Sequence, residues 1–151
     1  MIDRRSMLLA TAAVLAVAPS CAAPAKAAIK VYKDPSCGCC TAWADHLTEN
    51  GFAVTVEEDT DMAALKAKLG VPDDLGSCHT GVIAGYAIEG HVPAEDIKRL
   101  LAQKPSAIGL AVPAMPINSP GMEVPGEPDE PYTVWLFAAD GTRTAFAQHG
   151  G

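Results

Sequence analysis

The run Cys37-Gly38-Cys39-Cys40 constrains this chain more than any other feature, because it stands between a strand-like and a helix-like segment. One disulfide cannot use all three thiols, since disulfides join cysteines in pairs of suitable Cα separation. A helix N-terminus also stabilises the thiolate, the form of cysteine that attacks disulfides and binds metals. We therefore expect a functional thiol site at the start of a helix. The alternative is a purely structural disulfide, which small exported domains also use.

Strand-like and helix-like patterns alternate around this run. Gly51 follows the first helical pattern at the position of a left-handed C-cap, and Gly70 ends the second. Pro93 fits the first position of the third helix, with Glu95 and Asp96 in its first turn. Helices are therefore expected over residues 39–50 and 93–104, and a further helix is expected to run from an N-cap among residues 59–61 to residue 69. Strands are expected over residues 28–32, 52–57, 79–83, 86–91, 132–138 and 142–147.

The segment 105–131 differs from the rest of the chain, because seven of its residues are proline. Such a composition favours turns, so we expect a long loop with no core element. The order β-α-β-α-β-β-α, with the cysteines between the first strand and the first helix, is that of the thioredoxin fold. The expected fold class is therefore α/β, a thioredoxin-like fold with a Pro-rich loop and a C-terminal β-hairpin.

The first 27 residues have the pattern of an export signal. Arg4 and Arg5 form its charged region, residues 7–17 its apolar stretch and Ala25-Lys26-Ala27 a small-x-small cleavage site. A buried N-terminal helix is the alternative interpretation. The arginine pair resembles a twin-arginine signal, although an ordinary secretory signal also carries two arginines. We expect residues 1–27 to be a signal peptide and residues 28–151 to form one exported domain.

Composition excludes several classes of partner. The chain has 11 Lys and Arg against 18 Asp and Glu, a net charge of -7, so it lacks the basic surface that nucleic-acid binding requires. No apolar run beyond the N-terminus reaches the roughly 18 residues that span a bilayer, so the mature form is expected to have no membrane span. The 49% of apolar residues suffices for the core of one domain.

Donor chemistry decides which metal the thiolates suit. Tetrahedral zinc is usually held by two separate C-x(2-4)-C pairs, and the adjacent Cys39 and Cys40 fit that pattern poorly. Soft thiolates select Cu(I), and several thiolates in one place suit multinuclear copper with bridging sulfurs. The expected ion is therefore Cu(I).

Cys78 offers a fourth thiolate. The stretch Ser77-Cys78-His79-Thr80 stands where thioredoxins carry a cis-proline opposite their active-site cysteines, and it contains no proline. This departure places Cys78, and with it His79, where a metal could be closed between them and the run at residues 37–40. The alternatives for Cys78 are a small buried apolar residue or the disulfide partner of Cys37 or Cys40.

Other side chains have weaker claims to the site. Met115 and Met122 lie in the Pro-rich loop, where their thioethers would add soft ligands or pass copper along, or would only pin the loop to the core. His91 ends a predicted strand, and a lone histidine is more often an ordinary hydrogen-bonding residue, so His79 is the better candidate. His149 lies close to the C-terminus and is expected to be inert.

Several segments together resemble the CopG-type periplasmic copper-resistance family, and the resemblance covers nearly all of residues 28–151. They are Asp34-Pro35-Ser36-Cys37-Gly38-Cys39-Cys40 with Trp43, His46 and Leu47, then Cys78-His79-Thr80, Gly90-His91-Val92-Pro93, Met115-Pro116 and Ser119-Pro120-Gly121-Met122-Glu123. The resemblance implies a thioredoxin-like fold in the periplasm. It also implies Cu(I) held by the C-x-C-C loop and the further cysteine, as a multinuclear cluster, with a role in copper redox conversion or handling. The implied partners are copper ions and other periplasmic copper-resistance proteins.

Two hypotheses about function remain open. In the first, the protein binds Cu(I) in copper homeostasis through a metal site made of Cys37, Cys39, Cys40 and Cys78. In the second, it is a thiol-disulfide oxidoreductase in which Cys37 attacks a substrate disulfide and Cys40 resolves the mixed disulfide. A hybrid would couple disulfide formation to reduction of Cu(II). Whether the chain turns over as an enzyme is left open by the sequence.

Overall fold

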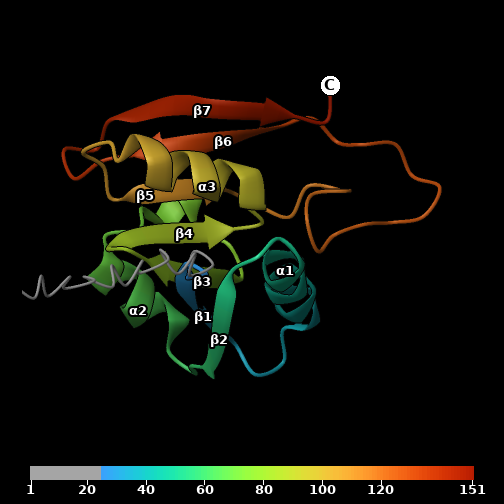
Figure 1. Cartoon of the computed structure of the whole chain (residues 1–151), viewed down its shortest axis with the longest axis horizontal. Helices are drawn as coiled ribbons and strands as arrows, with labels where there is room; N and C mark the ends of the chain where they lie inside the picture. Colours follow the sequence, from blue (N-terminus) through green and yellow to red (C-terminus); the bar gives the residue numbers. More distant parts are fainter. Residues whose placement is uncertain (1–24) are drawn as a thin grey trace, which may run out of the picture.

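A computed structural model describes residues 25–151, which form a mixed seven-stranded sheet and three α-helices (Figure 1). The strands are β1 (Ala28–Lys33), β2 (Ala53–Glu58), β3 (His79–Ile83), β4 (Tyr86–Gly90), β5 (Gly109–Val112), β6 (Tyr132–Phe137) and β7 (Arg143–His149). The helices are α1 (Gly38–Glu49), α2 (Met62–Leu69) and α3 (Ala94–Gln103), with a short 3₁₀ turn at Asp73–Leu75. The sheet order is β2-β1-β3-β4-β5-β6-β7, so β2 and β7 are its edges.

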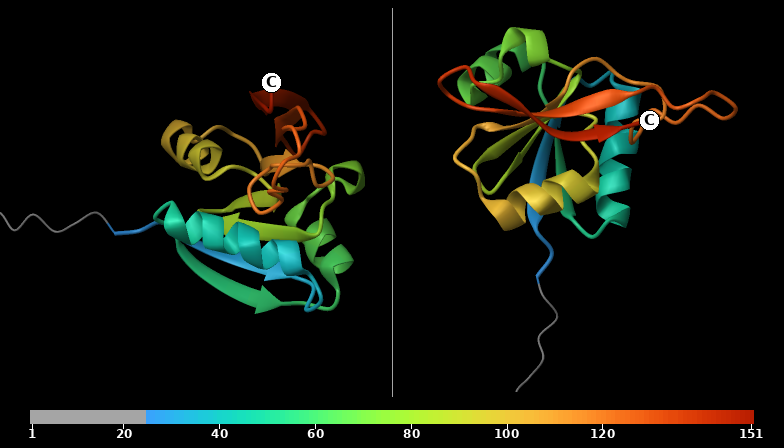
Figure 2. Two further views of the ribbon diagram at one scale, coloured as in Figure 1. Left: turned by 90° about the vertical axis from the view of Figure 1, so that its right-hand side faces the viewer. Right: turned by 90° about the horizontal axis from the view of Figure 1, so that it is seen from above.

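Two hydrophobic clusters lie on opposite faces of the sheet, as alternating residues of β4 and β5 show. Ile88 and Leu110 belong to the larger cluster, which contains the buried faces of α1 and α3. Ala87 and Ala111 belong to the smaller cluster, which lies under the end of α2 and the 3₁₀ turn. Figure 2 shows α1 and α3 on one side of the sheet and α2 on the other.

The predicted α/β class and the predicted order of the first seven elements are confirmed, and the C-terminal hairpin is present as the antiparallel pair β6 and β7. The prediction of no core element within residues 105–131 was wrong. Residues 109–112 form β5, in which all four residues are buried between β4 and β6. The short apolar run became a strand because tertiary pairing outweighs the turn preference of the prolines around it.

Helix α1 packs deeply against the sheet. Cys40, Trp43 and Leu47 lie one turn apart and are fully buried. The Trp43 indole N–H donates to the carbonyl of Val92 over 2.9 Å, which ties α1 to the segment before α3. The helix ends at the predicted place, where Gly51 adopts a φ of +91° that is favourable for glycine. These contacts fix the position of the cysteines at its first turn.

The Pro-rich loop after β5 reaches back to α1 before its tip projects from the body of the molecule (Figure 2). Gly121 has a φ of +85°, and a Cβ there would meet the Trp43 backbone nitrogen at 2.7 Å, so only glycine fits this close approach. All but the last three residues of the predicted signal peptide lie outside the described residues. Between residues 25 and 151, no helix combines the length and apolar character needed to cross a membrane.

Candidate metal centre

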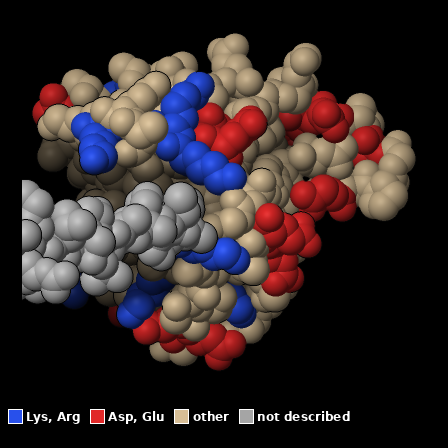
Figure 3. Space-filling model, viewed as in Figure 1, with Lys and Arg blue, Asp and Glu red and all other residues tan. Residues whose placement is uncertain are grey.

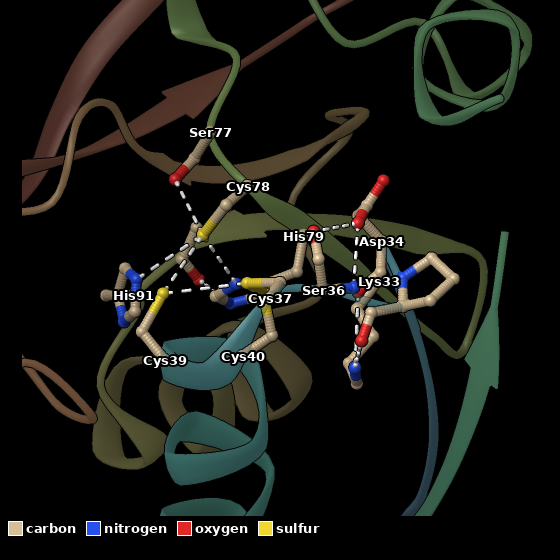
Figure 4. Close-up of a disulfide and its surroundings, with 12 residues drawn as sticks. Lys33, Asp34, Ser36, Cys37, Cys39, Cys40, Ser77, Cys78, His79 and His91 are labelled. Carbon is tan, nitrogen blue, oxygen red and sulfur yellow. Dashed lines mark hydrogen bonds between the residues drawn. A yellow bond between two sulfur atoms is a disulfide. The ribbon is translucent and has the colours of Figure 1, made fainter. Parts of the chain in front are cut away.

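Four cysteine sulfurs gather between the first turn of α1 and the start of β3 (Figure 4). Their atoms all lie within 4.8 Å of one another. Cys37 and Cys40 form a disulfide, while Cys39 and Cys78 are free thiols. The Cys39 Sγ lies 3.6 Å from the Sγ of Cys37 and 3.6 Å from that of Cys78, so it stands between the disulfide and the fourth cysteine.

Strand pairing explains how residues so far apart in the sequence meet. Strand β1 pairs with β3 in antiparallel register, with Lys33 opposite His79. The end of β1 therefore lies beside the start of β3. The turn Asp34-Pro35-Ser36 then delivers Cys37 to the N-cap of α1, where its backbone N–H donates to the Asp34 carbonyl over 3.0 Å. The cysteine run and Cys78 thus face each other across one end of the sheet.

Two buried histidines flank Cys78. The Cys78 Sγ lies 3.3 Å from the Nδ1 of His79 and 3.7 Å from the Nε2 of His91. The other ring nitrogen of each histidine contacts a backbone carbonyl, that of Gly90 over 3.0 Å and that of Pro120 over 2.8 Å. A carbonyl only accepts, so those nitrogens carry the protons and the lone pairs face the sulfur. Metal-binding histidines are commonly oriented in this way.

Burial keeps these histidines neutral. It lowers the pKa of His79 to about 3, with His91 adding to the effect, and it also lowers the pKa of His91. A neutral imidazole is the ligand form of histidine. Burial and the neighbouring Cys39 raise the pKa of Cys78 to about 11, so this thiol stays protonated until a metal or another cation replaces the proton. We define the sulfur centre as the four cysteines together with His79 and His91.

A buried carboxylate supports the segment that carries Cys78. Glu89 on β4 is fully buried, and its Oε1 accepts from the Ser77 backbone N–H over 2.5 Å. Its Oε2 accepts from the Thr80 hydroxyl over 2.6 Å, and its charge pairs with Lys66 of α2. A buried charge requires such partners. Glu89 therefore fixes the backbone on both sides of Cys78 and His79.

The Pro-rich loop closes one side of the sulfur centre through the contact of Pro120 with His91. Met122 follows this contact by two residues and is half-buried, whereas the side chain of Met115 is 49% exposed. Met122 therefore follows closely in the chain on the contact with His91, whereas Met115 is open to solvent. Their roles as ligands stay predictions.

Sequence reasoning placed His79 ahead of His91, whereas the structure places both beside Cys78. The signal for His91 was its position at the end of the strand that pairs with β3, in the motif Gly90-His91. Glu89 was missed altogether. A glutamate inside the predicted strand over residues 86–91 was the available signal, because a charge buried within a sheet needs a specific partner.

Thiolate and neutral imidazole suit a soft or borderline cation. The six side chains of the sulfur centre therefore fit the predicted Cu(I) in donor type. Three cysteines at the first turn of α1 also benefit from the helix dipole, which favours negative charge there. The same sulfur atoms can instead exchange disulfides, because Cys39 lies next to the disulfide between Cys37 and Cys40.

Two solved structures match the chain closely. They are copper resistance protein CopG, form 1 and form 2, each 46% identical to this chain with a TM-score of 0.78. The matches cover 83% and 82% of this chain and 99% and 98% of theirs. The family model described as "Protein of unknown function, DUF411" matches residues 75–122, a range that contains Cys78 and both buried histidines. No curated protein sequence matches the chain.

Proposed function

Because the chain belongs to the CopG copper-resistance family, we propose that it serves copper resistance by binding Cu(I) through its four clustered cysteines. The observation that carries the proposal is the gathering of the four sulfurs within 4.8 Å of one another. Thiolate sulfurs are soft donors and bridge neighbouring Cu(I) ions readily, so the cluster is proposed to be multinuclear. Full use of the four sulfurs requires reduction of the disulfide between Cys37 and Cys40.

Other side chains complete the proposed ligand set. His79 and His91 are both proposed as ligands, because Nδ1 of His79 and Nε2 of His91 lie beside the Cys78 sulfur. Met122 and Met115 of the Pro-rich loop are proposed as thioether donors that receive or release copper. The carbonyls that hold the two histidine rings prevent the lone-pair nitrogens from turning away from the sulfurs.

A redox role for the same site has a specific observation in its favour, the disulfide beside two free thiols. Oxidation of two thiols to one disulfide releases two protons and two electrons, which reduce two Cu(II) ions to two Cu(I) ions. The second candidate function is thiol-disulfide exchange without copper. In that reaction the half-buried Cys37 attacks a substrate disulfide and the fully buried Cys40 resolves the mixed disulfide.

The fold and the cellular setting enter the proposal as well. The alternation β1-α1-β2-α2-β3-β4-α3 around the sheet order β2-β1-β3-β4 supports a thioredoxin-like unit, to which the Pro-rich loop and the hairpin are additions. We infer that residues 1–27 are an export signal and that residues 28–151 are one copper-binding domain in the periplasm. There it would exchange copper with other copper-resistance proteins.

Copper uptake tests the main proposal. The full chain is reduced without oxygen, titrated with Cu(I) against a competing chelator, and assayed for copper per chain by elemental analysis. We expect tight uptake of more than one Cu(I), lost in Cys78→Ser. The matched control is Cys21→Ser, a cysteine in the predicted signal, which should leave uptake unchanged.

Two results would overturn the proposal. One is weak uptake by the reduced protein, and the other is full uptake by Cys78→Ser. Rapid catalysis of disulfide exchange together with weak uptake would favour the oxidoreductase instead. Circular dichroism of each variant confirms that the fold is retained.

A further inference from the structure

A second group of potential metal ligands lies away from the sulfur centre, where the end of β7 meets the first turn of α3. His149 is the last residue of β7, and Glu95 and Asp96 lie in the first turn of α3. One ligand atom from each of the three lies within 4.8 Å of the others. The expectation that His149 is inert is therefore not supported, because the pairing of β6 with β7 brings this residue back onto α3.

Asp96 orients the His149 ring. The Nε2 of His149 lies 2.7 Å from Asp96 Oδ2, and a carboxylate accepts, so this nitrogen donates. Asp96 is only 3% exposed, and its Oδ1 lies 3.0 Å from the guanidinium of Arg99. Tyr132 stacks on the other side of the imidazole, with ring centroids 5.2 Å apart. The ring is thus held by a carboxylate and an aromatic face, which is the outer support typical of a metal-binding histidine.

The remaining ring nitrogen points to a second carboxylate. Nδ1 of His149 lies 3.9 Å from Oε1 of Glu95, whose side chain is 76% exposed. Nitrogen and oxygen ligands each lie about 2.0–2.2 Å from a divalent ion such as zinc, so this spacing fits two ligands of one ion. In neutral His149, the proton donated to Asp96 leaves the lone pair on Nδ1.

A cleft of about 320 Å³ opens at this place and is strongly acidic. Glu95, Asp129, Glu130 and His149 are among the residues that line it, and Figure 3 shows acidic side chains gathered over the Pro-rich loop. A negative field of this kind favours a cation. We call this pocket the α3 cleft.

The other groups that line the α3 cleft do not occupy Nδ1 of His149 or the carboxylate of Glu95. His46 also lines the α3 cleft, but its Nε2 accepts from the Ala94 backbone N–H over 3.2 Å and is therefore occupied. Glu130 accepts from the Ile117 N–H, and Asp129 accepts from the Asn118 amide, each through one carboxylate oxygen. Each of these two carboxylates retains an oxygen for a cation or for a water bound to it.

We propose that the α3 cleft binds one divalent cation of the class that prefers nitrogen and oxygen ligands, with His149 Nδ1 and Glu95 as inner ligands. Cu(II) is the best fit, because it binds such mixed donors more tightly than the other divalent first-row metals. Asp96 is a positioning residue that acts through His149. Asp129 and Glu130 supply negative charge from the facing loop. This site shares no proposed ligand with the sulfur centre.

The experiment uses Cu(II) alone as the probe. Free thiols of the purified full chain are alkylated with N-ethylmaleimide, so that Cys39 and Cys78 neither bind nor reduce the ion. Electron paramagnetic resonance with nitrogen hyperfine analysis then identifies the ligands, and calorimetry measures affinity. We expect one Cu(II) per chain with one imidazole nitrogen. His149→Ala should remove that nitrogen signal, and Asp96→Asn should weaken affinity about tenfold.

Two variants that each remove one negative charge distinguish coordination of Cu(II) by Glu95 from general electrostatic attraction of the ion to the protein. Glu95→Gln should weaken Cu(II) binding strongly, whereas Glu58→Gln, which removes the same charge from edge strand β2 at the other end of the sheet, should not. Binding that survives both His149→Ala and Glu95→Gln would overturn the proposal. The proposal would also be overturned if the alkylated parent protein bound no Cu(II) and His149→Ala only lowered the thermal stability. His149 would then serve only to attach the end of the chain to α3.

Discussion

The sulfur centre and the α3 cleft orient histidines by the same means but place different donors around the free ring nitrogen. In the sulfur centre, backbone carbonyls hold His79 and His91, and the partner is the Cys78 sulfur. In the α3 cleft, the carboxylate of Asp96 holds His149, and the partner is another carboxylate. A carbonyl orients a ring without adding charge, whereas a carboxylate adds charge and makes the ring a stronger base. The donor beside the ring thus selects the class of ion.

The largest effect is expected from Cys39→Ser, which removes the sulfur between Cys37 and Cys78. We expect the affinity for Cu(I) to fall by at least about 100-fold, because an inner ligand matters more than its outer support. Competition with a Cu(I) chelator measures this change. Binding of Cu(II) in the α3 cleft should remain as in the parent protein, and a joint loss at both sites would break the comparison.

The same variant also separates the two candidate functions. An oxidoreductase that uses only Cys37 and Cys40 should keep its rate of disulfide exchange in Cys39→Ser. A copper cluster should not survive the change. Retained Cu(I) affinity with retained exchange would therefore contradict the copper proposal.

The two buried carboxylates Glu89 and Asp96 should differ in their importance for stability. Glu89→Gln leaves Lys66 without its partner, and the Lys66 side chain is only 15% exposed. Breaking a buried pair in this way should lower the free energy of unfolding by about 3 kcal/mol. Asp96→Asn should cost less, about 1–2 kcal/mol, because the side chains of its partners Arg99 and His149 are 42% and 23% exposed. Urea denaturation of both variants gives the difference, and equal losses would contradict it.

A smaller effect is expected where the Pro-rich loop touches α1. Gly121→Ala adds a Cβ that meets the Trp43 backbone at 2.7 Å and strains a positive φ, so we expect a loss of about 1–3 kcal/mol. The matched control is Gly126→Ala, which has a φ of +90° and open space around it. The difference between the two melting temperatures isolates the contact with α1. A larger loss in the control would show that this contact does not hold the loop.

The smallest effect should come from the loop methionines. Met122→Leu removes the thioether of a half-buried residue that follows Pro120 by two positions, and it should weaken Cu(I) binding by less than about tenfold. Met115→Leu, at an exposed position, should change affinity still less. Chelator competition measures both. A larger loss in Met115→Leu would place the copper path on the outer part of the loop.

Local patterns predicted the elements well because their signals are local. Gly70 ends α2 in a left-handed conformation with a φ of +75°, as expected. Pro93 is the N-cap of α3, one position before the predicted first helical residue. Strand β5 was missed because its burial depends on β4 and β6, which are distant in the sequence. Four consecutive residues among prolines give little periodicity from which to predict a strand.

In the candidate site too, residues with a local sequence signal were predicted, and those that depend on tertiary contacts were not. The three cysteines at α1 and Cys78 were found because residue type and spacing alone indicate thiol chemistry. His91 lies beside Cys78, as His79 does, because of the β3–β4 hairpin and because the carbonyl of the loop residue Pro120 holds its ring. The contact of His149 with Asp96 depends on the register of β6 and β7. Contacts between side chains that are brought together only by tertiary pairing cannot be predicted from either sequence segment alone.

The disulfide and the free thiol pair differ in how much of the chain they connect. Cys37 and Cys40 are separated by three positions, so their bond constrains only the first turn of α1. Cys39 and Cys78 are separated by 39 positions, so an ion held between them would act as a cross-link between α1 and β3. Local unfolding of α1 and local unfolding of β3 would then occur together rather than separately. Loading with copper should accordingly slow amide hydrogen exchange in α1 and β3 together, at sites far from the bound ion.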